Sequence, residues 1–178
     1  MQIYELLDNH EENSILEALS MKGKVILNSI EKSENISTWE QPYVTFFLER
    51  QTDDLMTYFD YNLFFLSHKS WKTLQPLVGS QLHVFPVKIY LRPELNYYAL
   101  KPLVVQDCID KTKSTLEVDD NGHILPEKVV LKSSKVNGLS VFRPFVGSYS
   151  PIFVSKGFKN LVEMHKLSGF YFQEVELI

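Results

Sequence analysis

The chain has 178 residues, of which 44% are hydrophobic and 22% are charged, and this balance excludes disordered and fibrous proteins. Its 18 Lys and Arg against 22 Asp and Glu give a net charge of -4, which excludes a broad binder of nucleic acids. No apolar run approaches the roughly 20 residues that span a bilayer, so we expect no membrane segment. The single cysteine, Cys108, and an opening Met1–Glu5 without the pattern of a signal peptide indicate a cytoplasmic protein.

The N-terminal part carries the weakest pattern in the chain. A short apolar start at Ile3–Leu7 is followed by a helix predicted over Glu12–Leu19, with Ser14 or Asn13 as its N-cap. The polar stretch Glu31–Thr38 is typical of a loop.

Two later stretches share one order of strand, serine, helix, glycine and strand. The first comprises Leu63–Leu66, Ser67, a helical pattern through Trp71, Leu74 and Val78, then Gly79 and Leu82–Val87. The second comprises Ile152–Val154, Ser155, a helical pattern through Phe158, Leu161, Val162 and His165, then Gly169 and Phe170–Val175. We expect each serine to cap its helix and each glycine to allow a left-handed exit, with Pro76 interrupting only the first helix. We interpret the two stretches as a degenerate internal duplication; two unrelated units with common caps are the alternative.

Strand residues dominate the rest of the chain. They occur in Tyr43–Leu48, Tyr97–Asp107, Ser114–Val118 and Lys128–Leu131, with a turn at Asp119–Gly122. These patterns predict an α+β fold with antiparallel-rich sheets and a few short helices. We divide the chain into a variable N-terminal segment, residues 1–45, packed on an α+β domain, residues 46–178, that is one unit or two fused halves.

The residues that catalysis or metal binding would need are not arranged for it. The five histidines are scattered, no CxxC or HExxH occurs, and no GxSxG elbow or phosphate-binding glycine loop is present, so we expect no catalytic residue, no metal and no cofactor. Helix capping explains Ser67 and Ser155 better than a nucleophilic role. Cys108 lies beside Asp107 and Asp110, whose charges would raise the pKa of its thiol and make it a poor nucleophile.

Several carboxylates and one arginine support an alternative function for the chain. Asp107 and Asp110, and also Asp53–Asp54 with Asp60, would serve acid–base chemistry, although an Asp at a strand end usually caps the next turn or pairs with a nearby lysine. Arg143 suits a carboxylate partner inside the fold, with ligand binding as its second role. The alternative function is therefore an enzyme or small-ligand binder with a pocket near Asp107, Asp110 and Arg143.

Four segments carry a resemblance to a known family. They are Tyr97–Asp110 with Lys113–Ser114, Val141–Arg143, Ile152–Ser155 and Leu167–Phe172. Together they resemble the bacterial polymorphic-toxin immunity family called immunity protein eleven, over roughly residues 50 to 178. The Cys108–Ile109 pair departs from the small or apolar pair usual there.

The resemblance implies a non-catalytic protein that binds and neutralises a cognate toxin domain encoded beside it. It supplies no catalytic residues. Exposed acidic side chains at Glu11, Glu12, Asp119 and Asp120 are the predicted toxin contacts, since charge often directs such pairs; a solvated surface is the alternative. No pattern indicates the oligomeric state.

Overall fold

A computed structural model of the chain describes residues 1–7, 15–31, 40–49, 53–58, 61–118, 120, 122, 124–145 and 151–178. Four helices lie in these ranges: α1 (Met21–Glu31), α2 (His68–Val78), α3 (Ser133–Val136) and α4 (Lys156–Met164). Strands form the rest of the fold, mostly in antiparallel pairs. The predicted α+β class with antiparallel-rich sheets is confirmed.

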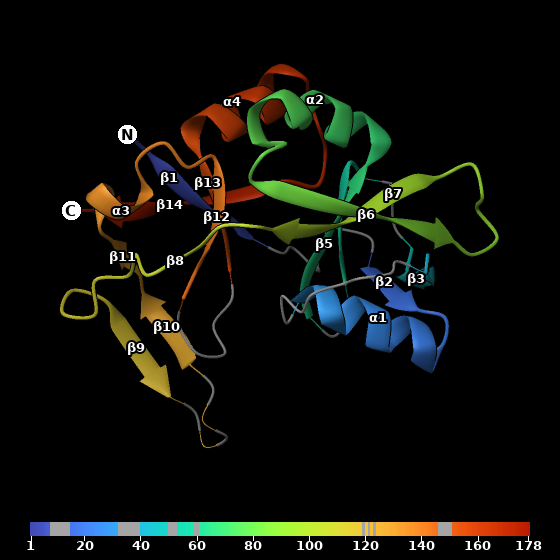
Figure 1. The fold of residues 1–178 in the computed structure, drawn as a ribbon, viewed down its shortest axis with the longest axis horizontal. Coiled ribbons are helices and arrows are strands. Elements are labelled where there is room, and N and C mark those ends of the chain that lie inside the picture. The colour runs from blue at the N-terminus through green and yellow to red at the C-terminus, as the bar shows by residue number, and fades with distance from the viewer. Residues whose placement is uncertain are drawn as a thin grey trace.

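A closed six-stranded barrel forms one side of the molecule (Figure 1). Its strands are β2 (Ile15–Ala18), β3 (Tyr43–Leu48), β4 (Leu55–Tyr58), β5 (Tyr61–Ser67), β6 (Leu82–Ile89) and β7 (Asn96–Pro102), in the order β2-β3-β6-β7-β5-β4. Alternate side chains point inward, as the period of a strand requires, so that Phe65, Val87 and Ala99 meet in the barrel core. Helix α1 adds Leu27 to the same core.

A six-stranded sheet forms the other side (Figure 1). Its strands are β1 (Ile3–Leu7), β8 (Val105–Gln106), β11 (Val130–Leu131), β12 (Val141–Pro144), β13 (Ile152–Ser155) and β14 (Tyr171–Leu177), in the order β11-β14-β1-β13-β12-β8. Strand β1 lies inside this sheet, pairing Leu6 with Ile152 on one side and with Phe172 on the other. Residues from the start of the chain therefore complete the sheet built by its end.

Each face of this sheet has its own apolar core. On one face, Tyr4 and Phe172 pack with the helices α2 and α4, which lie side by side (Figure 1). On the opposite face, Ile3, Phe153 and Val175 pack against residues that include Cys108 and Val136. The remaining pair, β9 (Thr115–Val118) and β10 (Ile124–Lys128), is a two-stranded hairpin that projects from the sheet (Figure 1). The first strand of this hairpin matches the predicted strand Ser114–Val118. The predicted strand Lys128–Leu131 is wrong as one element, because Lys128 ends β10 while Val130 and Leu131 form β11 of the six-stranded sheet. Asp119 and Asn121 of the predicted turn lie outside the described residues.

The two strand–serine–helix units have the same topology. Strand β7 lies between β5 and β6 and is antiparallel to both, so β5 and β6 run parallel to each other. Likewise β1 lies between β13 and β14 and is antiparallel to both. Each unit is thus a split β-α-β motif, with a strand from elsewhere in the chain between its two parallel strands. A duplication accounts for this shared topology, and it stays an interpretation.

The helix predicted over Glu12–Leu19 is wrong where the structure describes it. Residues 15–18 form strand β2, and the helix of this region, α1, begins only at Met21. Ile15 pairs with Thr57 of β4, while Ala18 pairs with Val44 of β3, so β2 closes the barrel. Long-range pairing overrides the local helical pattern. The first residues of the predicted helix, 12–14, lie outside the described residues. So do residues 32–38 of the predicted loop, whereas its first residue, Glu31, ends α1.

Two expectations about the end of α2 are also corrected. The helix continues through Pro76 to Val78, because Leu74 and Val78 are buried in the core and hold the last turn despite the missing amide. Gly79 has φ of -57°, a right-handed conformation and not a left-handed exit. Its lack of a side chain has another reason: a Cβ there would lie 2.8 Å from the carbonyl oxygen of Gln75.

Candidate functional site

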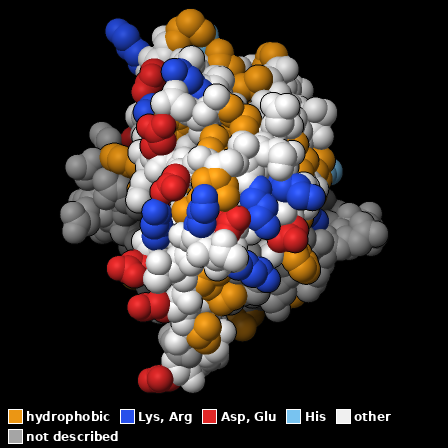
Figure 2. All heavy atoms as spheres, turned by 90° about the vertical axis from the view of Figure 1, so that its left-hand side faces the viewer, with side chains coloured by type: hydrophobic (Ala, Val, Ile, Leu, Met, Phe, Trp, Pro, Cys, Tyr) orange, Lys and Arg blue, Asp and Glu red, His pale blue; other side chains and the backbone are white. Residues whose placement is uncertain are grey.

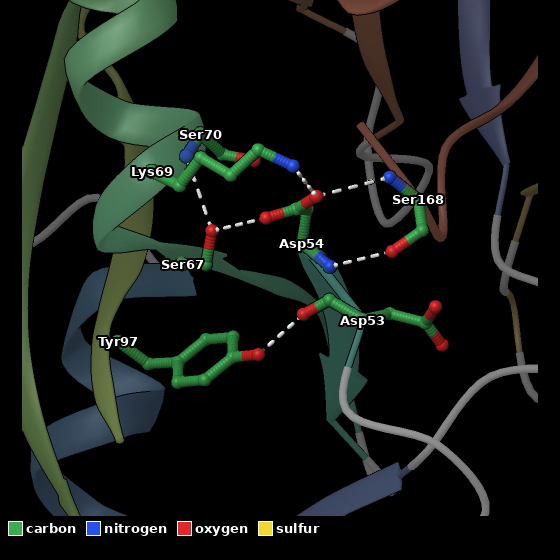
Figure 3. A network of polar contacts seen from close by, with 7 residues as sticks. All are labelled: Asp53, Asp54, Ser67, Lys69, Ser70, Tyr97 and Ser168. Carbon is green, nitrogen blue, oxygen red and sulfur yellow. Dashed lines mark hydrogen bonds and ion pairs between the residues drawn. The ribbon is translucent and has the colours of Figure 1, made fainter. Parts of the chain in front are cut away.

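A network of polar groups connects the barrel to the six-stranded sheet (Figure 3). At its centre, one oxygen of the Asp54 carboxylate accepts a hydrogen bond from the Ser67 hydroxyl at 2.7 Å, and the other accepts from the Ser168 amide at 3.2 Å. In return, the Asp54 amide donates to the Ser168 hydroxyl at 3.1 Å. Lys69 forms an ion pair with the same carboxylate at 3.0 Å. We call Asp54, Ser67, Lys69 and Ser168 the Asp54 joint, because it fastens β5, α2 and the loop after α4 together.

Gly169 allows the loop after α4 to reach this position. Its φ is +80°, and a Cβ on it would lie 2.3 Å from the carbonyl oxygen of Leu55 and 2.8 Å from Cβ of Asp53. The Leu55 amide donates to the Ser168 carbonyl at 3.1 Å, so the two backbones are in direct contact. The predicted left-handed glycine is present here, and its position also requires the absence of a side chain.

The Ser67 hydroxyl of the joint is not free to act as a nucleophile. The Ser67 hydroxyl donates to Asp54 and accepts from the Ser70 amide at 3.1 Å, so it is occupied as the N-cap of α2. Beside it, Tyr97 donates its hydroxyl proton to the Asp53 carbonyl oxygen (Figure 3). Burial, together with the charges of Asp54 and Asp53, raises the pKa of Tyr97 and keeps the phenol neutral. These groups hold the fold together; Asp60, grouped with them as an acid–base candidate, lies outside the described residues.

The other serine acts in the same way on the second helix. Ser155 precedes α4, and its hydroxyl accepts a hydrogen bond from the Phe158 amide at 3.3 Å. The two capping contacts are thus equivalent in geometry, but only Ser67 has a carboxylate partner as well.

The residues of the alternative pocket have separate environments. Asp110 uses one carboxylate oxygen to accept from the amide and hydroxyl of Thr112 and from the amide of Lys113. The Thr112 hydroxyl, and then its amide, lower the pKa of Asp110. This is the capping role that a strand-end Asp usually has. The side chain of Arg143 is buried, with 2% of its surface exposed, whereas Asp107 lies at the surface. The carboxylate partner expected for Arg143 stays a prediction.

Cys108 is fully buried and has no disulfide partner. Burial raises the pKa of its thiol to about 11, and Asp107 contributes a smaller increase. The predicted direction is confirmed, but its main cause is desolvation. Within the described ranges no cluster of three or more His, Cys, Asp or Glu side chains is arranged to hold a metal ion.

The predicted contact residues are only partly described. Asp120 is exposed in the turn between β9 and β10, whereas Glu11, Glu12 and Asp119 lie outside the described residues. Two residues before Asp120, at the end of β9, Val118 is 65% exposed. The hairpin therefore presents both a carboxylate and an apolar side chain to solvent.

A groove of about 440 Å³ separates the hairpin from the sheet. Its walls come from the end of β10 and the residue after it (Pro126–Val129), from β14 (Gln173–Glu176) and from β1 (Glu5 and Leu7). We call this the β10–β14 groove. Figure 2 faces the end of the molecule that carries these strands and shows carboxylate side chains along one side, with lysines and arginines across the middle.

Comparison with known protein families finds a match over part of the chain. Residues 92–177 match the immunity protein family Imm11. The resemblance inferred from the sequence is confirmed over this part of the chain. No curated protein matches the chain.

The Imm11 match is shorter than the expected range from about residue 50. It begins in the turn before β7 and covers every later strand, so it contains the sheet strands β8 and β11–β14, the hairpin and α4. Helix α2 and the barrel strands β2–β6 lie outside it. None of the helices in the described ranges is long and apolar enough to cross a membrane.

Sequence reasoning missed both the Asp54 joint and the β10–β14 groove. Asp54 and Ser168 are 114 residues apart, and nothing local to either residue indicates the other. The groove forms where β10 turns away from β14, and these two strands are also far apart in the sequence. One signal was available for the joint: Gly169 follows Ser168 directly, and a glycine often marks a close backbone approach.

Proposed function

We propose that this protein is an immunity protein that binds a cognate toxin domain in the cytoplasm and blocks its activity without turnover. The Imm11 match over residues 92–177 is the observation on which the proposal rests. Immunity protein families are generally non-catalytic, and binding requires only a complementary surface.

The chemistry of the described residues supports this proposal. The carboxylates of Asp54 and Asp110 and the hydroxyls of Ser67 and Ser155 serve the fold's own turns and helix ends. The neutral, buried thiol of Cys108 is unsuited to attack a substrate. Exposed acidic groups such as Asp120 of the hairpin and Glu127 of the β10–β14 groove are accessible to a second macromolecule.

Co-expression tests the proposal. The toxin domain encoded beside this chain's gene is expressed in a test host with and without the chain, and an unrelated toxin at the same level serves as the control. We expect restored growth with the cognate toxin only, and a stable complex in size-exclusion chromatography of the purified pair. If the chain neither restores growth nor forms the complex, it is not the immunity protein of that toxin.

A further inference from the structure

The β10–β14 groove exposes the edge of a strand. Strand β11 pairs with β14 only at Val130–Glu176 and Leu131–Leu177. Strand β10, which immediately precedes β11, leaves the sheet and pairs with β9. Residues 172–175 of β14 therefore have β1 on one side, and no strand of the described ranges pairs with them on the other.

The direction of the main-chain groups follows from the contacts at the end of β14. The Ile178 amide donates to the Leu131 carbonyl at 3.0 Å, and the Ile178 carbonyl accepts from the Ser133 amide at 2.8 Å, so residue 178 faces the β11 side. Alternate residues of a strand direct their N–H and C=O groups to the same side. The amide and carbonyl of Glu174 therefore point toward the groove, where an added strand would find them.

The charge of the groove favours one kind of occupant. Its lining includes four acidic residues, Glu5, Glu127, Glu174 and Glu176, and one basic residue, Lys128. Lys128 pairs with Glu176 at 2.8 Å, and this hydrogen bond lowers the pKa of Glu176, which stays ionised. Leu7, Pro126 and Val175 add apolar surface between the charges. A segment that alternates basic and apolar side chains matches this lining, since successive side chains of a strand face opposite ways.

We propose that the β10–β14 groove binds an extended segment of the toxin that carries lysine or arginine side chains and adds a strand to the free edge of β14. Main-chain hydrogen bonds to the edge give such a complex its affinity, and the groove carboxylates select the basic side chains. This inference rests on the proposed function, because it names the surface through which the toxin is held.

Two matched pairs of variants test the inference on the full chain, with an inactive form of the toxin domain as the ligand. Glu174→Pro removes the outward amide and the side-chain charge, whereas Glu174→Ala removes only the charge. Proline is tolerated on a strand edge whose N–H faces outward, so pairing with β1 is retained. We expect the Kd to rise about tenfold or more for the proline variant and much less for alanine, since 1.4 kcal/mol corresponds to a factor of ten.

The second pair reverses one charge in each variant. Glu127→Lys lies in the groove, and Glu163→Lys lies on α4, on the opposite face of the sheet. We expect Glu127→Lys to weaken binding and reduce its salt dependence, and Glu163→Lys to leave the Kd unchanged. Hydrogen exchange should also show new protection of the amide of Glu174 in the wild-type complex.

The outcomes separate this inference from the proposed function. If the wild-type chain binds the toxin but the Glu174→Pro and Glu127→Lys variants bind as tightly, the groove is not the binding surface, and the immunity function stands. If the wild-type chain forms no complex at all, both are overturned. Circular dichroism confirms that each variant is folded before its Kd is measured.

Discussion

Replacing Gly169 with alanine should loosen the contact between the barrel and the six-stranded sheet. The residue has φ of +80°, where an L-residue with a side chain is strained by about 1–2 kcal/mol. The new Cβ would also lie 2.3 Å from the Leu55 carbonyl oxygen, and ordinary contact begins at 3.4 Å. The loop must therefore move by about 1 Å, the difference between these two distances.

This displacement weakens three hydrogen bonds at once. They are Leu55 amide to Ser168 carbonyl, Asp54 amide to Ser168 hydroxyl, and Ser168 amide to Asp54 carboxylate, at 3.1, 3.1 and 3.2 Å. A typical bond contributes about 1 kcal/mol, and these are partly exposed, so together they account for about 2 kcal/mol. With the backbone strain, we expect Gly169→Ala to lower the free energy of unfolding by about 3–4 kcal/mol.

Gly138 supplies the matched control. It has the same φ of +80°, but a Cβ on it would meet nothing within 4 Å. Gly138→Ala should therefore cost only the backbone strain, about 1–2 kcal/mol. Urea unfolding followed by circular dichroism measures both variants. If Gly169→Ala is no more destabilising than Gly138→Ala, the close approach to Leu55 contributes nothing to stability, and the reasoning is refuted.

Three further predictions concern single side chains. Ser67→Ala should lower the free energy of unfolding by about 2 kcal/mol and Ser155→Ala by about 1 kcal/mol, because Ser67 caps its helix and also donates to Asp54. Equal losses for the two variants in urea unfolding would contradict this. The pKa of Tyr97 is raised from 10.0, so the stability that its neutral phenol contributes is complete below pH 10 and falls as the pH rises above 10. Tyr97→Phe should flatten this fall in the free energy of unfolding, and an unchanged fall would show that Tyr97 is not its cause. The pKa of Cys108 is raised from 9.0 to about 11, so at pH 8 the thiolate fraction should be about a hundredfold smaller in the folded chain than in the unfolded chain. Reaction of Cys108 with a disulfide reagent should therefore be slow until urea is added, and fast labelling of the folded chain would show that the thiol is accessible.

Features that depend on neighbours in the chain were predictable from the sequence. The Ser67 and Ser155 caps each bind an amide three residues ahead, so serine position and helical spacing are enough to predict them. The raised pKa of Cys108 was predicted in direction but assigned to the wrong main cause, because burial is not visible in a sequence window. The Imm11 resemblance was recognisable because its segments keep their order and spacing.

Features that depend on distant partners were not predictable. Residues 15–18 look helical, yet they form β2 because β3 and β4 offer hydrogen-bond partners on both sides. Strand β1 gives no sign that β13 and β14 will enclose it.

By itself, then, the sequence determined the class of fold, the two capped strand–helix units and the resemblance of residues 92–177 to the Imm11 family, since each is encoded in residues close together or in their order. Only the tertiary structure decided that Asp54 meets Ser168, that Gly169 touches Leu55 and that β10 leaves the edge of β14 exposed. The physical reason is that strand pairing and main-chain contacts join groups through space, and every residue carries the same N–H and C=O groups. No single residue type marks where such a contact will form.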